Sequence, residues 1–453
     1  SDHQQLEQLV IKARHRYTEV GESLTEKFLK HYADERFRLT GMLHQTEIFE
    51  KKVKPRIVEG KTAYVWVDAL RYEMARELAE TLDEEFEMEI QPALGMIPTI
   101  TPIGMAALLP GAHESAAVVP ANGNKLALKI GDTVLKDRND RVKFLKDSVE
   151  VKVFATKLER LIPRPNKKIR EKISDADLIL ITSQEIDLLA EEDNVPLTRQ
   201  IMGSVLRNLQ RAFRNLSELG VETIVFTADH GYLLGEELSS DMKIDAPGGD
   251  TVDLHRRIWV GRGGAADSSY LRAQLSDFGL SEDLEIATPW NFACFKVRGG
   301  STAYFHGGLS PQELFIPVVT LKPKKAEPVG LTGEIEWKLI PGSQKISTRF
   351  FSIQVKGTTT SLLELVPPKV RIEIRVQGKS ISNPVSASYG FEEATGDVQL
   401  RLVEDKPGEI EPNTITLMIT EETDQKTVTG YLLDATSGTE LARLEKVEMA
   451  IFI

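Results

Sequence analysis

The chain has 453 residues, of which 41% are hydrophobic and 27% charged, and its formal net charge at neutral pH is −12. This length allows two or three domains with cores of their own, and the acidic balance argues against a protein that binds polyanions over its whole surface. No apolar run approaches the ~20 residues needed to cross a bilayer, and the polar start Ser1-Asp2-His3 predicts no signal peptide.

The single cysteine, Cys294, excludes disulfides within the chain and any multi-cysteine zinc site. One thiol in a chain of this length is typical of a reducing compartment, so we expect a cytoplasmic protein. The apolar neighbours Phe292, Ala293 and Phe295 indicate a buried structural thiol rather than a nucleophile. Since the chain lacks an initiator Met, we expect a fragment or a processed protein.

The first part of the chain predicts helices. Apolar residues recur at helical spacing through 4–52 among many charges, which indicates two or three amphipathic helices with breaks near Gly21 and Gly41. We therefore assign 1–57 to an N-terminal helical segment.

Residues 58–320 alternate between strands and helices. Short apolar runs at 63–67, 177–182 and 222–228 predict buried strands, and helical spacing predicts helices at 70–82, 104–109 and 199–219. This alternation indicates an α/β fold with a mostly parallel central sheet. The mixed segment 113–172 interrupts it, and we expect an inserted cap with a hairpin and a helix.

Charge is unevenly distributed, because residues 125–172 hold fifteen Lys/Arg and seven Asp/Glu, a local charge of +8. Such a segment is either an ordinary solvated face or an arm that contacts phosphates, and the sequence favours neither.

The pattern changes beyond a Lys- and Pro-rich linker, which we place at 321–330. Residues 331–453 alternate between apolar and polar positions and are divided by Gly, Pro, Asn and Asp turns. We predict a C-terminal immunoglobulin-like β-sandwich there, without a cluster of catalytic residues.

The pair Asp229-His230 follows the predicted strand 222–228, and Gly231 follows the pair. Ligands of parallel sheets bind outside the carboxyl ends of the strands, so the two side chains are well placed to hold a metal ion. The alternative is a solvated aspartate beside a hydrogen-bonded histidine.

Two earlier segments have the same placement. Asp68 ends the strand 63–67, and Arg71 follows it, either to bind a phosphate or to form an ion pair. Thr101 lies between Pro98 and Gly104 at the start of a helix, where a threonine is usually an N-cap but beside a metal could attack phosphorus.

Two later segments complete the set. Asp187 and Glu191 are four residues apart and would share one face of a helix, unless they form a solvated acidic turn. His306 precedes two glycines, which allow the close backbone approach that a crowded metal site needs.

In this order, the motifs resemble the alkaline-phosphatase superfamily, and within it the PglZ domain of bacterial BREX phage-defence systems. The resemblance covers about 60–320. It is carried by Val-Asp68-Ala-Leu-Arg71-Tyr-Glu, Pro-Thr-Ile-Thr101-Pro-Ile-Gly, Ile-Asp187, Ala-Asp229-His230-Gly, His255-Arg256-Arg257 and His306-Gly-Gly-Leu-Ser-Pro-Gln-Glu.

The resemblance implies two divalent metal ions (Zn, Mn or Mg) and a threonine nucleophile, Thr101, with Thr99 as its rival. The ligands it implies are Asp68, Thr101, Asp229 and His230 for one ion, and Asp187, Glu191 and His306 for the other. Relatives usually have histidine where Glu191 stands, and a carboxylate there favours manganese or magnesium over zinc. Arg71 and His255 are weaker candidates for binding substrate oxygens.

We therefore expect a metal-dependent phosphodiesterase or nuclease in phage defence. Its substrate would be a nucleic acid or nucleotide phosphodiester, its partners other defence proteins, and no membrane would be involved. The alternatives are a phosphomonoesterase of the same superfamily and a non-catalytic scaffold of a defence complex.

Overall fold

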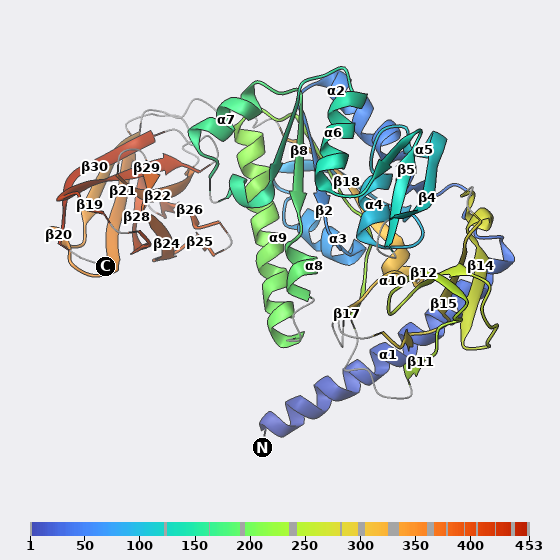
Figure 1. Cartoon of the computed structure of the whole chain (residues 1–453). Helices are drawn as coiled ribbons and strands as arrows, with labels where there is room; N and C mark the ends of the chain where they lie inside the picture. The colour runs from blue at the N-terminus through green and yellow to red at the C-terminus, as the bar shows by residue number, and fades with distance from the viewer. Residues whose placement is uncertain are drawn as a thin grey trace. The chain divides into compact units, whose positions relative to one another are not determined.

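The computed structural model (Figure 1) describes residues 2–121, 125–162, 164–190, 195–234, 242–280, 283–297, 304–324, 335–359, 367–376, 379–393, 395–404, 406–421, 423–435 and 440–450. The chain divides into two compact units, Ser1–Lys324 and Lys325–Ile453. No described helix is long and apolar enough to span a lipid bilayer.

A seven-stranded sheet forms the centre of the first unit, with the strand order β1-β3-β18-β9-β2-β8-β7. Its strands are β1 (Leu43–His44), β2 (Thr62–Val67), β3 (Phe86–Leu94), β7 (Val153–Lys157), β8 (Leu178–Ser183), β9 (Thr223–Ala228) and β18 (Phe315–Pro323). Only β18 runs antiparallel to its neighbours, so the predicted α/β fold with a mostly parallel sheet is confirmed.

Three adjacent strands of this sheet, β9, β2 and β8, are buried at every position. Uniform burial explains their continuous apolar runs, since a parallel strand is covered on both faces. Helices α6 (Arg138–Ser148) and α9 (Val195–Glu218) flank the strands in Figure 1. The remaining helices of the sheet region are α2 (Lys54–Glu59), α3 (Tyr72–Glu80), α4 (Thr101–Ala107), α5 (Ala112–Ser115), α7 (Lys167–Ser174), α8 (Glu185–Ala190) and α10 (Pro311–Leu314).

The N-terminal segment differs from the prediction. A single helix, α1 (Asp2–Asp34), runs through Gly21, so the expected break there is wrong. A Cβ atom at position 21 would lie 2.5 Å from the ring of Phe292, which shows that this glycine serves a close helix contact rather than a turn. Gly41 does lie in a turn, with φ +82°.

The basic segment has two structural parts. Strands β4 (Ala116–Ala121), β5 (Lys125–Ile130) and β6 (Thr133–Leu135) form a small antiparallel sheet, and α6 follows it. Strand β7 then pairs in parallel with β8. The segment that we expected to be an inserted cap therefore also supplies the edge strand of the central sheet.

A four-stranded antiparallel sheet lies between β9 and β18 in the chain, with the order β12-β13-β15-β14. Its strands are β12 (Asp250–Leu254), β13 (Trp259–Arg262), β14 (Tyr270–Gln274) and β15 (Glu285–Pro289). The same stretch of the chain contains two further pairs of short strands. Strand β10 (Leu233–Leu234) pairs with β17 (Tyr304–Phe305), and β11 (Lys243–Ile244) pairs with β16 (Cys294–Phe295).

The second unit consists of two antiparallel sheets around one core. One contains β19 (Ile335–Pro341), β21 (Phe350–Thr359), β24 (Ser382–Ala387), β27 (Leu402–Val403) and β28 (Lys406–Ile419). The other contains β20 (Lys345–Ile346), β22 (Lys369–Val376), β23 (Lys379–Ser380), β25 (Phe391–Glu392), β26 (Asp397–Gln399), β29 (Thr427–Asp434) and β30 (Glu440–Met449). Ile353 and Ile415 of the first sheet share a hydrophobic cluster with Ile372 and Leu432 of the second, as in a β-sandwich.

The expected linker at 321–330 overlaps the last strand of the central sheet. Residues 321–323 belong to β18, and residues 325–330 lie outside the described part of the chain.

Candidate active site

The carboxyl ends of β2 and β9 place two acidic residues side by side. In the sheet register, Val67 pairs with Ala228, so Asp68 and Asp229 occupy the next position of each strand. Both side chains are buried, with exposed fractions of 1% and 0%. This is the edge at which parallel sheets bind their ligands.

Asp68, Asp229 and His230 form a compact group of potential metal ligands. One ligand atom from each lies within 4.8 Å of the others. His230 Nε2 is 3.3 Å from Asp229 Oδ2 and 3.9 Å from Asp68 Oδ1. Three buried groups of this kind, two of them carboxylates, match the oxygen and imidazole donors of a divalent metal site.

The two carboxylate oxygens of Asp229 differ in their hydrogen bonds. Oδ1 accepts from the backbone N–H groups of Ala69 and His230, both at 2.9 Å. Ala69 adopts a left-handed conformation with φ +58°, an uncommon one for a residue with a Cβ, and so aims its N–H at this carboxylate. Oδ2 is buried, and no residue in the described ranges hydrogen-bonds to it, which leaves it available to a cation.

The ring of His230 is oriented by its own neighbour. Nδ1 lies 3.0 Å from the carbonyl oxygen of Gly231, so we assign the N–H to Nδ1. The unprotonated Nε2 then faces Asp68 and Thr101 as an acceptor or a ligand.

Thr101 is the first residue of α4, and its hydroxyl points into this group. Oγ1 lies 3.1 Å from His230 Nε2 and 3.5 Å from Asp68 Oδ1. The N-cap position belongs to Ile100, which makes no side-chain cap, so Thr101 does not have the usual role of a threonine at a helix start. The rival Thr99 is fully buried and donates to the carbonyl oxygen of Gly308 at 2.7 Å.

Helix α4 packs directly against the backbone of the loop after β9. A Cβ atom at Gly104 would lie 2.2 Å from the carbonyl oxygen of Asp229. Only glycine allows this approach, which brings Thr101, one turn earlier, to the metal-ligating group.

A second set of residues lies next to the first. His306 Nε2 is 3.7 Å from Asp187 Oδ1, and Tyr304 donates to the same Oδ1 at 3.0 Å. The rings of His230 and His306 stack with centroids 4.1 Å apart and an angle of 8°. Glu191, the third ligand that we expect in this set, lies outside the described residues.

Burial and mutual repulsion dominate the electrostatics here. Burial raises the pKa of Asp68 well above its ordinary value, and the charges of Asp229 and Asp187 raise it further. Burial likewise raises the pKa of Asp187. Burial lowers the pKa of His306, with His230 as the next cause. A cation would relieve the repulsion between the carboxylates, so the donor set fits a metal ion.

The two weaker candidates are placed differently. Arg71 forms an ion pair with Glu73, not with Asp68, and its guanidinium lies over the ring of Tyr232 at 5.3 Å. His255 lies 3.3 Å from Asp253 and is 40% exposed. Its charge is among the causes that lower the pKa of His306, so it is near the second set.

No sequence pattern singles out Arg141, which is one of five Lys and Arg residues between positions 131 and 151. Its side chain is only 7% exposed, and no ion pair or side-chain hydrogen bond joins it to another described residue. Burial lowers the pKa of its guanidinium, while Asp229 and Asp68 oppose that shift. One turn earlier on α6, Arg138 donates to Thr182 Oγ1 at 3.0 Å, which places this face of α6 at the carboxyl end of β8.

Gln45 and Tyr304 were also missed. The Gln45 amide donates to the carbonyl oxygens of Ala228 and Asp229 at 3.1 and 2.8 Å, and accepts from the N–H of Met96 at 2.7 Å. It thus ties the loop after β9 to the loop that leads to α4. No local pattern identifies Gln45. Tyr304 stands two residues before His306, and the alternation of side chains along a strand could have placed both on one face.

The model of a family described as "BREX system PglZ alkaline phosphatase-like domain" matches residues 48–321. The chain is 28% identical over 307 residues to "Alkaline phosphatase-like protein BrxZ" of Escherichia coli O9:H4 (strain HS), a match that covers 63% of this chain and 33% of that protein. It is 24% identical over 370 residues to "Alkaline phosphatase-like protein PglZ" of Bacillus cereus (strain H3081.97), covering 77% of this chain and 41% of that protein. The chain thus spans less than half of either relative.

Among solved structures, phosphonoacetate hydrolase from Sinorhizobium meliloti 1021 matches in complexes with phosphonoacetate and with phosphonoformate. Both matches have a TM-score of 0.38, and the identities are 11% and 12%. Each covers 58% of this chain and 89% of the hydrolase chain.

Proposed function

The chain belongs to the BREX system PglZ alkaline phosphatase-like domain family, and we propose that it is a divalent-metal-dependent phosphodiesterase with Thr101 as its nucleophile. The observation that carries this proposal is the position of the Thr101 hydroxyl, 3.1 Å from His230 Nε2 and 3.5 Å from Asp68 Oδ1. A hydroxyl among buried metal ligands is the arrangement that activates a weak nucleophile.

The proposed metal ligands follow from the two sets of side chains. Asp68, Asp229 and His230 would hold one ion, while Asp187 and His306, with Glu191 as a further proposed ligand, would hold the other. Their carboxylate-rich character favours manganese or magnesium. When bound, such ions lower the pKa of a coordinated hydroxyl and neutralise charge on the oxygens of a phosphoryl group.

The residues of the chain then have distinct tasks. The Oγ1 of Thr101 forms a bond to phosphorus while the bond from phosphorus to the leaving oxygen breaks, and the proton that Oγ1 gave up ends on that oxygen. The products are an alcohol and a threonine phosphodiester that keeps the second ester group. Water then attacks phosphorus, the Oγ1–P bond breaks, a phosphate monoester is released and Oγ1 takes back a proton. The carbonyl oxygen of Gly231 keeps the His230 ring in the tautomer whose Nε2 faces Oγ1, and Asp229 Oδ1 accepts from the backbone N–H of His230. The Gln45 side chain joins the loop of Asp229 to the loop of Met96 by hydrogen bonds to the backbone of each.

The charge on α6 supports a diester of a polyanion as the substrate. Lys143 and Lys146 are exposed on the same helix as the buried Arg141, within the segment of local charge +8. Cations outside the site attract further phosphates, which a nucleic acid or nucleotide supplies and a small monoester does not. Membership of a BREX family supports a role in phage defence together with other defence proteins.

We expect the metal-loaded protein to hydrolyse bis-p-nitrophenyl phosphate with a higher kcat/KM than p-nitrophenyl phosphate. The two substrates share the same leaving group and differ in the second ester bond, so their ratio of kcat/KM tests the proposed preference for diesters. The measurement is the release of nitrophenol with Mn²⁺, Mg²⁺ or Zn²⁺, with protein in EDTA as the control. A preference for the monoester would instead identify a phosphatase.

We expect Arg141→Gln to lower kcat/KM for bis-p-nitrophenyl phosphate by roughly 10- to 100-fold. A buried guanidinium that makes no side-chain hydrogen bond with a described residue is free to donate to a non-bridging oxygen, and a hydrogen bond to a charged group contributes about 1.5–3 kcal/mol. Steady-state kinetics measure this effect, and thermal denaturation checks that the variant is folded.

The matched control for Arg141 is Lys143→Gln, an exposed cation on the same helix. It should change kcat/KM for this small substrate by less than about threefold, because exposed charges interact weakly. Equal losses in the two variants would show that Arg141 acts only through general charge.

A further inference from the structure

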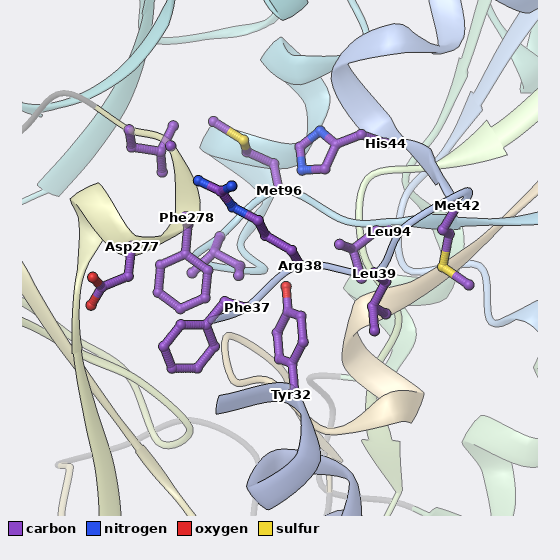
Figure 2. Close-up of a pocket in the computed structure, with 13 residues that line it drawn as sticks. Tyr32, Phe37, Arg38, Leu39, Met42, His44, Leu94, Met96, Asp277 and Phe278 are labelled. Carbon is purple, nitrogen blue, oxygen red and sulfur yellow. The ribbon is translucent and has the colours of Figure 1, made fainter. Parts of the chain in front are cut away.

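A cavity of about 250 Å³ lies apart from the proposed metal ligands, and its lining includes none of them. Figure 2 shows residues from the end of α1 and the segment after it, from β3 and from the 3₁₀ helix Leu275–Phe278 around this space. Its lining combines aromatic rings with aliphatic side chains and thioethers. The aliphatic residues and thioethers are Leu39, Met42, Leu94, Met96, Ile97 and Leu280.

Three aromatic rings form the first wall. Phe37 and Phe278 have centroids 4.4 Å apart, and Phe37 lies edge-on to Tyr32 at 5.3 Å. The flat faces of such a cluster suit a planar ring, because base–aromatic stacking stabilises binding by about 1–3 kcal/mol for each base.

The backbone that presents this wall is strained. Arg36 and Phe37 are consecutive residues with φ +53° and +57°, just after α1 ends. A left-handed residue after a helix is usually glycine, and each residue with a side chain in this region costs on the order of 1 kcal/mol. Such strain persists where the surroundings require it, often at a ligand site.

Polar groups reach the same space. The Tyr32 side chain is 1% exposed, its hydroxyl points into the cavity in Figure 2, and no described residue hydrogen-bonds to it. His44 lies at the rim, where Thr46 occupies its Nδ1 at 2.8 Å and burial lowers its pKa, so the imidazole is neutral. The Tyr32 hydroxyl can therefore donate to a ligand that has hydrogen-bonding atoms in its ring.

Charges at the mouth restrict the ligand further. The exposed Arg38 side chain extends between Met96 and Phe278 in Figure 2, and no ion pair or side-chain hydrogen bond joins it to another described residue. It can bind one anionic group, whereas the carboxylate of Asp277 beside the same cavity disfavours a long polyphosphate. The volume is at the small end for ligand sites and holds one base and ribose.

We propose that this cavity binds a nucleoside monophosphate, with the base between the aromatic and aliphatic walls and the phosphate at Arg38. This cavity is separate from the catalytic site, but its lining is connected to that site through the backbone and through Gln45. Met96 and Ile97 of its wall precede Thr99 and Thr101, and the Gln45 side chain connects the N–H of Met96 to the carbonyl oxygen of Asp229.

The test is isothermal titration of the metal-free protein in EDTA with AMP, GMP, CMP, UMP and adenosine. We expect at least one monophosphate to bind with a stoichiometry of one. Phe278→Leu should weaken binding by roughly 5- to 150-fold, the equivalent of one lost stacking contact. Tyr32→Phe, which keeps the ring, should also weaken it. Arg38→Gln should remove the advantage of AMP over adenosine.

Asp229→Asn is the control, because it alters the catalytic site and leaves the cavity intact, and it should bind the nucleotide as the wild type does. Binding that survives Phe278→Leu but is lost in Asp229→Asn would assign the nucleotide to the catalytic site and overturn the proposal. The absence of binding for all four monophosphates would overturn it as well.

Discussion

Thr101→Val is expected to lower kcat for bis-p-nitrophenyl phosphate by about 10³- to 10⁶-fold, the range found when a covalent nucleophile is removed. Valine has nearly the shape of threonine but lacks the hydroxyl, which lies 3.1 Å from His230 Nε2. Helix α4 should therefore form as before. Kinetics with saturating Mn²⁺ measure the loss, and metal titration checks that the ligands remain competent.

Thr99→Val is the matched control, since the two threonines are two residues apart. Its hydroxyl is already bonded to the carbonyl oxygen of Gly308 at 2.7 Å. We expect Thr99→Val to reduce stability by about 1 kcal/mol, the usual value of such a hydrogen bond, and to retain most of the turnover. Thr101→Ser should keep measurable activity. If Thr101→Val remains within tenfold of the wild type, Thr101 is not the nucleophile.

The second large effect concerns metal binding by Asp229. A divalent ion at roughly 100 times its Kd should raise the free energy of unfolding of the wild type by about 2.7 kcal/mol. Asp229→Asn should abolish most of this gain, because it removes the carboxylate charge, and no described residue hydrogen-bonds to the buried Oδ2. Thermal denaturation with and without Mn²⁺ measures the gain without any need for catalysis.

Protons compete with the ion for the same carboxylates. The folded pKa of Asp68 and of Asp187 is raised above the ordinary 3.8. In the metal-free protein, the stability that their protonated forms contribute is fully present below pH ~3.8 and is lost as pH rises through the raised values. Metal affinity should therefore increase with pH across that window.

The control for metal binding is Asp267→Asn, an exposed aspartate whose carboxylate accepts from the N–H of Ser269. It should leave the metal-dependent stabilisation intact. A wild-type protein whose stability did not respond to any of the three ions would contradict the metal site, and would favour a scaffold in a defence complex.

Local pattern predicted the elements that form the site. The buried runs of β2, β8 and β9 are apolar because both faces of the sheet are covered, so their strands can be located from the sequence. Asp68, Asp229 and His230 could then be placed at the ends of strands, where parallel packing gathers them. Distances between them could not be predicted, and the role of Glu191 stays a prediction.

Long-range packing decided the rest. Local sequence predicts a helix break at Gly21. In the structure, this glycine instead allows close contact with Phe292, which lies 271 positions further along the chain. Strand β7 belongs to the central sheet because it pairs with β8, although its surroundings in the sequence are basic. Neither contact can be predicted from the periodicity of the local sequence.

The sequence by itself determined the positions of β2, β8 and β9 and which acidic and histidine residues follow them, because periodicity and position at strand ends are local properties. Only the tertiary structure decided which charges are buried. Arg141 reads as one cation among fifteen, yet it alone combines burial with proximity to Asp68 and Asp229 in the described basic segment. Burial, and with it the cost of an unpaired charge, depends on elements that meet only after the chain has folded.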